Sequence, residues 1–361
     1  MPAGLQRRDL WDNPMGTDGF EFVEYTGPDP QALAALFERM GFVAAARHRS
    51  KNVTLYKQGE VNFILNAEPG SFAQAFARLH GPSVCAIAFR VADAGKAYER
   101  AIGLGAKPVH GKVGPMELHI PAIEGIGGSL IYLVDRYGER TIYDVDFNPL
   151  VTDPAPAGVG LTAIDHLTHN VHRGRMELWA EFYERLFNFR EIRYFDIEGK
   201  LTGLKSKAMT SPCGRIRIPI NESADDKSQI AEYLEAYHGE GIQHIALATA
   251  DIYATVEALQ SRAVAFMAVP DTYYEAIDSR VRGHGEDLAR LQRDRILIDG
   301  APGDGQGLLL QIFTETVIGP IFFEIIERKG NEGFGEGNFR ALFESIERDQ
   351  IGRGVLKPDA E

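Results

Sequence analysis

The sequence predicts an α+β fold with two domains, each an open barrel-like sheet made of paired βαβββ modules. The main observation is an internal repeat with a long period, which indicates duplicated modules rather than a solenoid. The order of strand-like and helix-like stretches is the same in both halves. At 361 residues the chain also exceeds the length at which a single hydrophobic core keeps growing.

Three pairs of segments carry this repeat, each in the same order. In the first pair, each segment is the end of a predicted amphipathic helix, with apolar residues at helical spacing, that leads into a strand. In the second pair a strand passes into a helix at Asp93 and at Asp251, and in the third pair an apolar strand closes each half. The pairs are 35–42 with 181–189, 84–106 with 242–264, and 129–136 with 321–328.

The Pro- and Gly-containing stretch TDPAPAGVG (152–160) is the predicted linker between the halves. We therefore expect an N-terminal domain over 1–151 and a C-terminal domain over 152–361. The order of elements resembles the vicinal oxygen chelate superfold, which serves several unrelated chemistries, so the fold alone does not choose a function.

Composition excludes several classes of function. A formal net charge of −13 argues against binding to nucleic acid or to an anionic membrane surface. The longest apolar runs are much shorter than a membrane span, and the first residues lack the apolar core of a signal peptide. Two cysteines, Cys85 and Cys213, cannot build a disulfide framework, which favours a reducing cytoplasm.

Three metal-capable side chains lie on three separate apolar strands: His166, His244 and Glu324. Because side chains alternate along a strand, His166 and His169 point to opposite faces and cannot both bind one metal. Glu324 lies between apolar neighbours, where an unpaired carboxylate costs several kcal/mol unless it binds a cation. The three residues therefore predict a metal site.

The repeat provides an internal control for this site. Alignment of the halves places Ala86 opposite His244 and Tyr132 opposite Glu324, while His166 falls opposite Phe20 or Glu21. Because these positions hold no complete ligand set in the N-terminal half, we expect that half to be structural. The metal is expected in the C-terminal half.

Two imidazoles and one carboxylate with open positions are typical of non-haem Fe(II) oxygenases. Catalytic zinc uses similar ligands and is the chief alternative. The ligands here lie on strands rather than on an HExxH helix, which argues against a zinc hydrolase.

Two further stretches are expected near the site. In LLLQIFTE, Gln311 and Phe313 share one strand face, which would place an amide and a ring on one cavity wall. The segment 333–350 begins with glycines and continues as an amphipathic helix. This C-terminal helix either closes over the site or simply packs against the domain.

A more specific resemblance comes from IDHLTHNV, GRIRIPINES, GEGIQHIAL, PDTYYE, LLLQIF, FFEIIERKG and GFGEGNF, which occur in this order. Over residues 18–355 the chain closely resembles the bacterial 4-hydroxyphenylpyruvate dioxygenase family. The resemblance implies that His166, His244 and Glu324 bind Fe(II). It implies catalytic roles for Gln311, Phe322, Phe334 and Asn338, and substrate-binding roles for Ser206, Asn221, Gln229, Phe313 and Phe339.

The resemblance further implies that 4-hydroxyphenylpyruvate and O2 are converted to homogentisate and CO2 in tyrosine catabolism. No separate 2-oxoglutarate is needed, because the substrate carries its own 2-oxo acid. The alternative is 4-hydroxymandelate synthase, which acts on the same substrate. An extradiol catechol dioxygenase and a non-catalytic small-molecule binding protein are further alternatives on this fold. We also expect a homo-oligomer.

Overall fold

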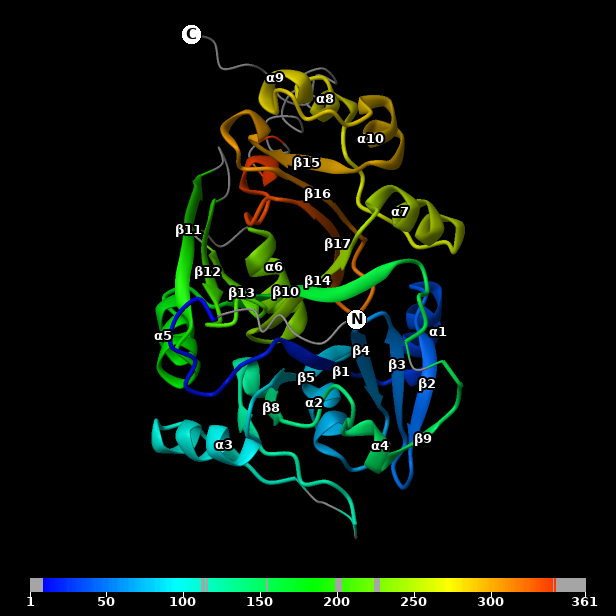
Figure 1. Cartoon of the computed structure of the whole chain (residues 1–361), viewed down its shortest axis with the longest axis vertical. Helices are drawn as coiled ribbons and strands as arrows, with labels where there is room; N and C mark the ends of the chain where they lie inside the picture. The colour runs from blue at the N-terminus through cyan, green and yellow to red at the C-terminus, as the bar shows by residue number, and fades with distance from the viewer. Residues whose placement is uncertain are drawn as a thin grey trace.

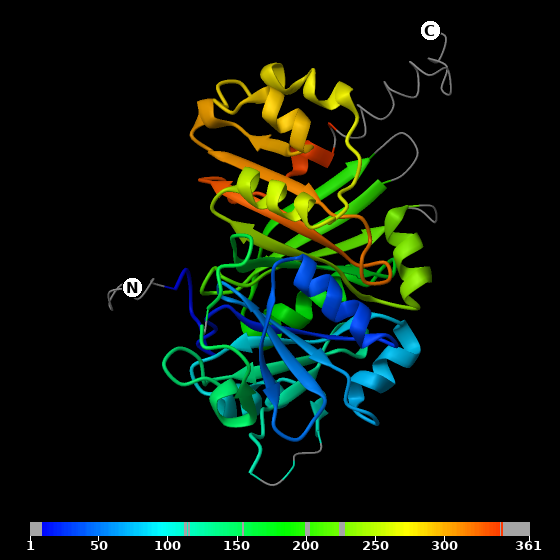
Figure 2. The same cartoon turned by 90° about the vertical axis from the view of Figure 1, so that its right-hand side faces the viewer.

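The computed structural model describes residues 9–111, 114, 116–153, 155–198, 203–223, 228–339 and 341. Within these residues, two mixed sheets follow one another along the long axis of the molecule (Figure 1). Figure 2 shows the first sheet, with blue and cyan strands, below the second, whose strands run from green to orange.

The described part of the first half forms a nine-stranded sheet in the order β6-β7-β8-β5-β1-β4-β3-β2-β9. Its strands are β1 (Phe20–Thr26), β2 (Val43–His48), β3 (Val53–Gln58), β4 (Val61–Asn66), β5 (Ser83–Arg90), β6 (Pro108–Val109), β7 (Ala122–Glu124), β8 (Leu130–Val134) and β9 (Phe147–Pro149). Its helices are α1 (Pro30–Arg39), α2 (Phe72–His80), α3 (Ala94–Gly103) and α4 (Tyr143–Asp146), with a 3-10 turn at Ile126–Gly128.

The described part of the second half forms an eight-stranded sheet in the order β11-β12-β13-β10-β14-β17-β16-β15, which curls like a half barrel (Figure 1). Its strands are β10 (Leu161–Val171), β11 (Arg190–Glu198), β12 (Gly203–Thr210), β13 (Arg217–Ser223), β14 (Gly241–Thr249), β15 (Leu297–Gly300), β16 (Leu308–Phe313) and β17 (Phe322–Lys329). Its helices are α5 (Met176–Phe187), α6 (Gln229–Tyr237), α7 (Ile252–Ser261), α8 (Asp271–Tyr274), α9 (Ile277–Arg280) and α10 (Leu288–Asp294), with a 3-10 turn at Pro302–Asp304.

The βαβββ modules predicted from the repeat are confirmed in both sheets. In the second sheet, β10, α5 and β11–β13 form one module, and β14, α7 and β15–β17 form the other, with α8–α10 inserted before β15. The first strands of the two modules, β10 and β14, pair antiparallel at the centre of the sheet, and each has its own module's last strand beside it in parallel. The fold class is therefore as predicted.

Polar side chains set where several helices begin. Asp93 and Asp251, which the repeat placed at strand-to-helix junctions, are the N-caps of α3 and α7, and each accepts a backbone N–H of the first turn. A second acid caps each helix in an equivalent way. Asp135 accepts the first backbone N–H of α3, and Glu327 accepts the first backbone N–H of α7. No helix within the described ranges is long and apolar enough to cross a membrane.

A single large hydrophobic core includes residues from both sheets and from the helices that flank them. Aromatic pairs cross between the halves: Phe63 stacks on Phe323 with ring centroids 5.9 Å apart, and Phe89 meets Phe187 edge to face at 5.2 Å. The end of the predicted linker contacts the first sheet, because the backbone N–H of Val159 donates to the side chain of Gln58, as does that of Leu161 at the start of β10.

Strand register aligns the two halves residue by residue. His166 pairs with Ala246, which pairs with Glu324. In the first sheet Phe22 pairs with Ala88, which pairs with Tyr132. Tyr132 is thus the counterpart of Glu324, as the repeat indicated. The counterpart of His166 is Phe22, not Phe20 or Glu21.

The counterpart positions differ in what surrounds them. Phe22 and Tyr132 belong to a separate apolar cluster on one face of the first sheet, with Leu55, Ile64 and Val134. The corresponding cluster among the described residues of the second sheet is much smaller and consists of Ala246, Leu309 and Ile326 with the partly buried Ala248.

Candidate metal centre

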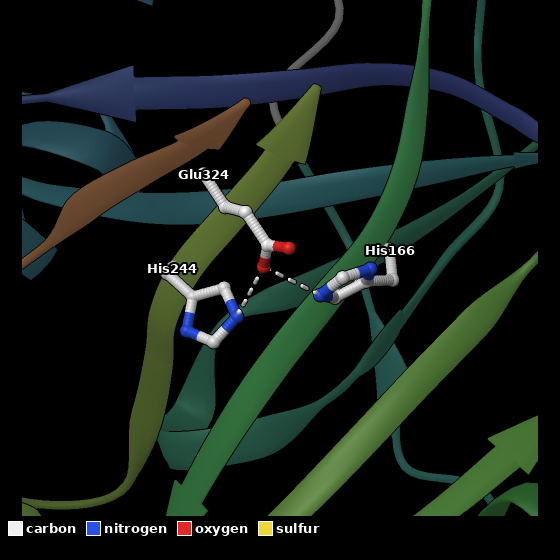
Figure 3. A group of neighbouring side chains, drawn as sticks. All are labelled: His166, His244 and Glu324. Carbon is white, nitrogen blue, oxygen red and sulfur yellow. Dashed lines mark ion pairs between the residues drawn. The ribbon is translucent and has the colours of Figure 1, made fainter. Parts of the chain in front are cut away.

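Three adjacent strands at the centre of the second sheet bring His166, His244 and Glu324 together. Figure 3 shows the side chains converging from β10, β14 and β17. One ligand atom from each residue lies within 4.8 Å of the other two. Glu324 Oε2 lies 3.2 Å from His166 Nε2 and 3.4 Å from His244 Nε2. The three residues are far apart in the sequence, and the pairing of their strands in the sheet brings them together.

Burial makes this cluster costly unless a cation binds. The side chains of His166 and Glu324 are each 3% exposed, and that of His244 is 10% exposed. Glu324 Oε1 is buried and has no hydrogen-bond partner in the described structure. A buried carboxylate oxygen without a donor is destabilising. Two imidazole nitrogens and this oxygen are suitable ligands for a divalent transition metal.

The electrostatics of the cluster are those of a carboxylate held against two imidazoles. Burial by itself raises the pKa of Glu324, but His166 and His244 outweigh it and lower that pKa to about 2. For His166, burial is likewise outweighed, and Glu324 and Asp165 raise its pKa. Burial dominates for His244 and lowers its pKa. Glu324 is therefore ionised and ready to bind a cation at neutral pH.

Each histidine is oriented by a hydrogen bond to its other ring nitrogen. His166 Nδ1 lies 2.8 Å from Asp165 Oδ1, and His244 Nδ1 lies 3.1 Å from Gln243 Oε1. An oxygen at Nδ1 favours the tautomer with its proton there, which leaves Nε2 free to bind a metal. In both cases the Nε2 atom is the one that faces Glu324.

Asp165 is a partner of His166 that strand alternation did not predict. A regular strand would place Asp165 and His166 on opposite faces. The pairing of β10 with β14 shifts register between Ile164 and His166, which is the signature of a β-bulge. The bulge allows the neighbouring side chains to meet, and the sequence signal for it was an acidic residue directly before a candidate ligand.

His169 lies away from the cluster, as strand alternation predicted. Its Nε2 atom is 2.7 Å from the hydroxyl of Tyr183 on α5. Burial lowers the pKa of His169 to about 3, so its ring is neutral. His169 is a core residue.

A cavity of about 230 Å³ opens beside the three residues. Its walls come from β10–β14, β16, β17, α6 and the segment after β17. The lining residues are His166, Thr168, Phe195, Leu204, Ser206, Pro219, Asn221, Ser228, Gln229, Ile230, Gln243, His244, Met267, Phe313, Phe322, Glu324, Phe334, Glu336 and Phe339. Ten of the twelve site residues expected from the sequence are in this set.

Aromatic rings surround the candidate ligands. Phe322 stacks on His244 with centroids 4.9 Å apart and planes 21° apart. Phe313 meets Phe322 edge to face at 5.9 Å, and Phe334 meets His166 edge to face at 5.3 Å. One wall of the cavity can therefore hold an aromatic ring close to a bound metal.

Polar groups lie on the opposite strands. Ser206 on β12 pairs in register with Asn221 on β13, so their side chains are cross-strand neighbours. Gln229 is the first residue of α6, at the exposed edge of the same cavity. These three side chains can donate to or accept from a polar substituent of a ligand.

Gln311 and Asn338 do not line the cavity. Asn338 Nδ2 donates to Gln311 Oε1 at 3.3 Å, and Asn338 Oδ1 accepts from the hydroxyl of Tyr273 at 2.6 Å. Arg280 donates to both that hydroxyl and Asn338. These two expected site residues therefore anchor the segment after β17 to the sheet and to the inserted helices.

The predicted C-terminal helix is described only at its start. Residues 336–339 and 341 are helical, and this first part contributes Phe339 to the cavity. The rest of the predicted helix, residues 342–350, lies outside the described residues.

Two family models match the chain. Residues 11–148 match the N-terminal model of hydroxyphenylpyruvate dioxygenase. Residues 163–282 match the glyoxalase/bleomycin resistance protein/dioxygenase superfamily. The first match therefore covers the first sheet, and the second match covers part of the second sheet.

Similar proteins cover almost the whole chain. The chain is 64% identical to 4-hydroxyphenylpyruvate dioxygenase of Pseudomonas aeruginosa, over 95% of this chain and 97% of that protein. It is also 64% identical to hemolysin VllY of Vibrio vulnificus, over 95% and 98% of the two chains. Among solved structures, a triple mutant of 4-hydroxymandelate synthase from Streptomyces coelicolor aligns with a TM-score of 0.80 at 26% identity, over 93% of this chain and 100% of that one.

Proposed function

The chain belongs to the 4-hydroxyphenylpyruvate dioxygenase family, and on that premise we propose that its cavity converts 4-hydroxyphenylpyruvate and O2 to homogentisate and CO2. The observation that carries the proposal is the cluster of His166, His244 and Glu324 opening into an aromatic cavity. A cavity of about 150 Å³ suffices for benzene. The cavity here, about 230 Å³, leaves room for a ring with a short side chain.

We propose that the metal is Fe(II), bound by His166, His244 and Glu324. The Glu324 carboxylate, whose Oε2 faces both Nε2 atoms, completes a donor set of two imidazoles and one carboxylate, which suits non-haem Fe(II). When bound, Fe(II) would supply open positions for the 2-oxo acid of the substrate and for O2. Zinc remains the alternative metal, and metal analysis after reconstitution distinguishes the two.

The aromatic wall would orient the substrate ring. Phe322 and Phe334 lie against the two histidine ligands, so a ring between them would lie next to the metal. Offset or edge-to-face contacts of this kind contribute about 0.5–1.5 kcal/mol each beyond buried area. Phe313 and Phe339 complete the apolar surroundings.

Polar side chains would fix the orientation of the substrate. Ser206 and Asn221 are neighbours on one wall, and Gln229 lines the same cavity from α6. We propose that these groups hydrogen-bond the phenol hydroxyl or the side chain of the substrate. Gln311 and Asn338 would act differently, by holding Phe334 and Phe339 in place and so excluding water from the cavity.

The product test separates the dioxygenase from the synthase. Protein reconstituted with Fe(II) under nitrogen, then given 4-hydroxyphenylpyruvate and O2, should form homogentisate and one CO2 per turnover. 4-Hydroxymandelate as the main product would instead support the synthase, to which the chain has a more distant likeness. Ring cleavage of catechols without a 2-oxo acid would indicate an extradiol enzyme, and absence of O2 uptake a binding protein.

We also propose how the chain is organised. Residues 1–151 would be a structural domain and residues 152–361 the catalytic domain, because the apolar cluster around Phe22 and Tyr132 occupies the positions that correspond to the metal site. The two cysteines are free thiols, in keeping with a cytoplasmic location. We expect a homo-oligomer, and light scattering of the purified protein tests this.

A further inference from the structure

The side chain of Arg328 lies between a candidate metal ligand and the turn after β17. Arg328 is the residue four positions after Glu324, and its side chain is 14% exposed. Its Nε donates to Asp165 Oδ2 at 2.7 Å, and its Nη2 donates to Asp165 Oδ1 at 2.8 Å. Such a bidentate pair is geometrically specific. Asp165 in turn accepts from His166, so Arg328 is one residue removed from the ligand.

The same guanidinium also holds the turn 331–334, which we call the Phe334 turn. Its Nη1 donates to the carbonyl oxygens of Asn331 at 3.0 Å and Gly333 at 2.6 Å. Its central carbon lies 5.7 Å from the centre of the Phe334 ring. The ring of Phe334 in turn meets the His166 ring at 5.3 Å. His166 is therefore connected to the Phe334 turn in two ways, directly through Phe334 and indirectly through Asp165 and Arg328.

A second arginine strengthens this link. Arg217 on β13 donates to Asp165 Oδ2 at 3.3 Å and also binds Glu332 in the Phe334 turn. Asp165 is therefore bound by two guanidinium groups that both reach the same turn. The Asp165 side chain is 5% exposed, so its charge is compensated almost entirely by protein groups.

We propose that Arg328 is a positioning residue that couples the metal ligand His166 to the Phe334 turn, so that metal binding and ordering of the aromatic wall support each other. This inference rests on the proposed metal site. A metal that fixes the His166 ring would, through Asp165 and Arg328, also hold the backbone of the Phe334 turn. Conversely, loss of Arg328 would leave the turn held by Arg217, by Phe334 itself and, further along the segment, by the bond of Asn338 to Gln311.

The first sheet shows which part of this network is general to the fold. Glu21 lies at the bulge that corresponds to Asp165, and Arg90 on β5 donates to it at 2.6 Å, although the neighbouring ligand position is Phe22. An acid paired with arginine at the bulge is therefore architectural. The counterpart of Arg328 is Arg136, which is exposed. Among the described residues, the second sheet alone has an arginine from its last strand that contacts both the bulge acid and a following turn.

The test compares Arg328→Gln and Arg328→Lys with the matched control Arg90→Lys. Metal affinity is measured by titrating metal-free protein with Co(II) and following its visible absorption, which requires no turnover. Hydrogen exchange of the amides at 331–335 is measured with and without Co(II). Circular dichroism and thermal unfolding establish that each variant is folded.

In the wild type, Co(II) should slow exchange in the Phe334 turn. Arg328→Gln should weaken Co(II) binding about 10–100-fold, the usual cost of removing an outer partner of a metal ligand, and should abolish the protection of the turn. Arg328→Lys keeps a charge beside Asp165 but cannot also reach both carbonyl oxygens. It should retain affinity within a few-fold while losing most of the protection.

Arg90→Lys should leave Co(II) affinity and protection of the turn unchanged. The coupling is refuted if Co(II) protects the turn in Arg328→Gln as it does in the wild type, or if all three variants change affinity equally. A wild-type protein that binds no Co(II) would overturn the proposed metal site itself, and the coupling with it.

Discussion

Phe22 and Tyr132 pack with their ring centroids 5.6 Å apart, at the positions that His166 and Glu324 occupy in the second sheet. The two sheets therefore share one scaffold, and the same pair of positions holds either an apolar contact or a metal-ligand pair. The first sheet therefore forms with no metal ligands at these positions. Substitutions at the metal site should separate metal binding from stability.

His244→Ala is expected to remove metal binding while leaving the fold intact. Ala86 already occupies the corresponding position in the first sheet, where it pairs with Leu130 as His244 pairs with Phe322. Metal content after reconstitution should fall to background, and activity should fall with it. Thermal unfolding of the metal-free variant should stay close to that of the metal-free wild type. Unchanged metal content would refute the site.

Glu324→Gln should change how stability depends on pH in metal-free protein. The pKa of Glu324 falls from 4.5 to about 2 in the folded state, so its carboxylate stabilises the fold above about pH 4.5. That contribution, of the order of a few kcal/mol, is lost as the pH falls toward 2. Urea unfolding of the two proteins should therefore differ most near neutral pH and converge in acid. A difference that stays constant with pH would contradict this.

Phe322→Leu should impair catalysis, whereas Phe323→Leu should impair stability. Phe322 lines the cavity and stacks on His244, while Phe323 points to the shared core and stacks on Phe63. Loss of an aromatic contact of about 0.5–1.5 kcal/mol predicts a several-fold fall in kcat/KM for Phe322→Leu. Steady-state kinetics and urea unfolding of both variants check the contrast. Equal effects of the two substitutions on kcat/KM would contradict the assignment of Phe322 to the cavity and Phe323 to the core.

Tyr273→Phe and Tyr274→Phe should differ although the residues are adjacent. The Tyr273 hydroxyl bonds Asn338, Arg280 and the backbone of Ile298. The Tyr274 hydroxyl is buried with no hydrogen-bond partner in the described structure. Tyr273→Phe should cost about 1–3 kcal/mol and raise KM, because Asn338 loses the shortest of its three side-chain hydrogen bonds. Tyr274→Phe should be neutral or stabilising, and a loss equal to that of Tyr273→Phe would contradict the anchor.

Gly335→Ala should be more damaging than Gly330→Ala. Both residues have positive φ, +80° and +82°, so each substitution costs about 1–2 kcal/mol for conformation. At Gly335 an added Cβ would also clash with the side-chain oxygen of Gln311, whereas at Gly330 the nearest atom is 3.8 Å away. Only Gly335→Ala should displace the Phe334 turn and raise KM. Urea unfolding and kinetics of both variants test this, and equal effects would rule out the steric contact.

The sequence by itself determined the repeated modules, the three metal-capable residues and the strand face of His169. These features depend on side-chain periodicity and on the order of elements, which are local properties of the chain. Register between distant strands is not local, so the sequence could not align His166 with Phe22. Nor could it place Asp165 beside His166, because a bulge breaks the alternation from which faces are inferred.

Only the tertiary structure decided which residues reach the cavity. Gln311 and Phe313 share a strand face, yet Phe313 lines the cavity and Gln311 bonds Asn338, because the segment after β17 packs over one end of β16. The contacts of Arg328 also depend on the tertiary structure. Its position after Glu324 was visible in the sequence, but its partners come from β10 and from a turn whose path depends on packing. Hydrogen bonds between segments far apart in the chain require coordinates.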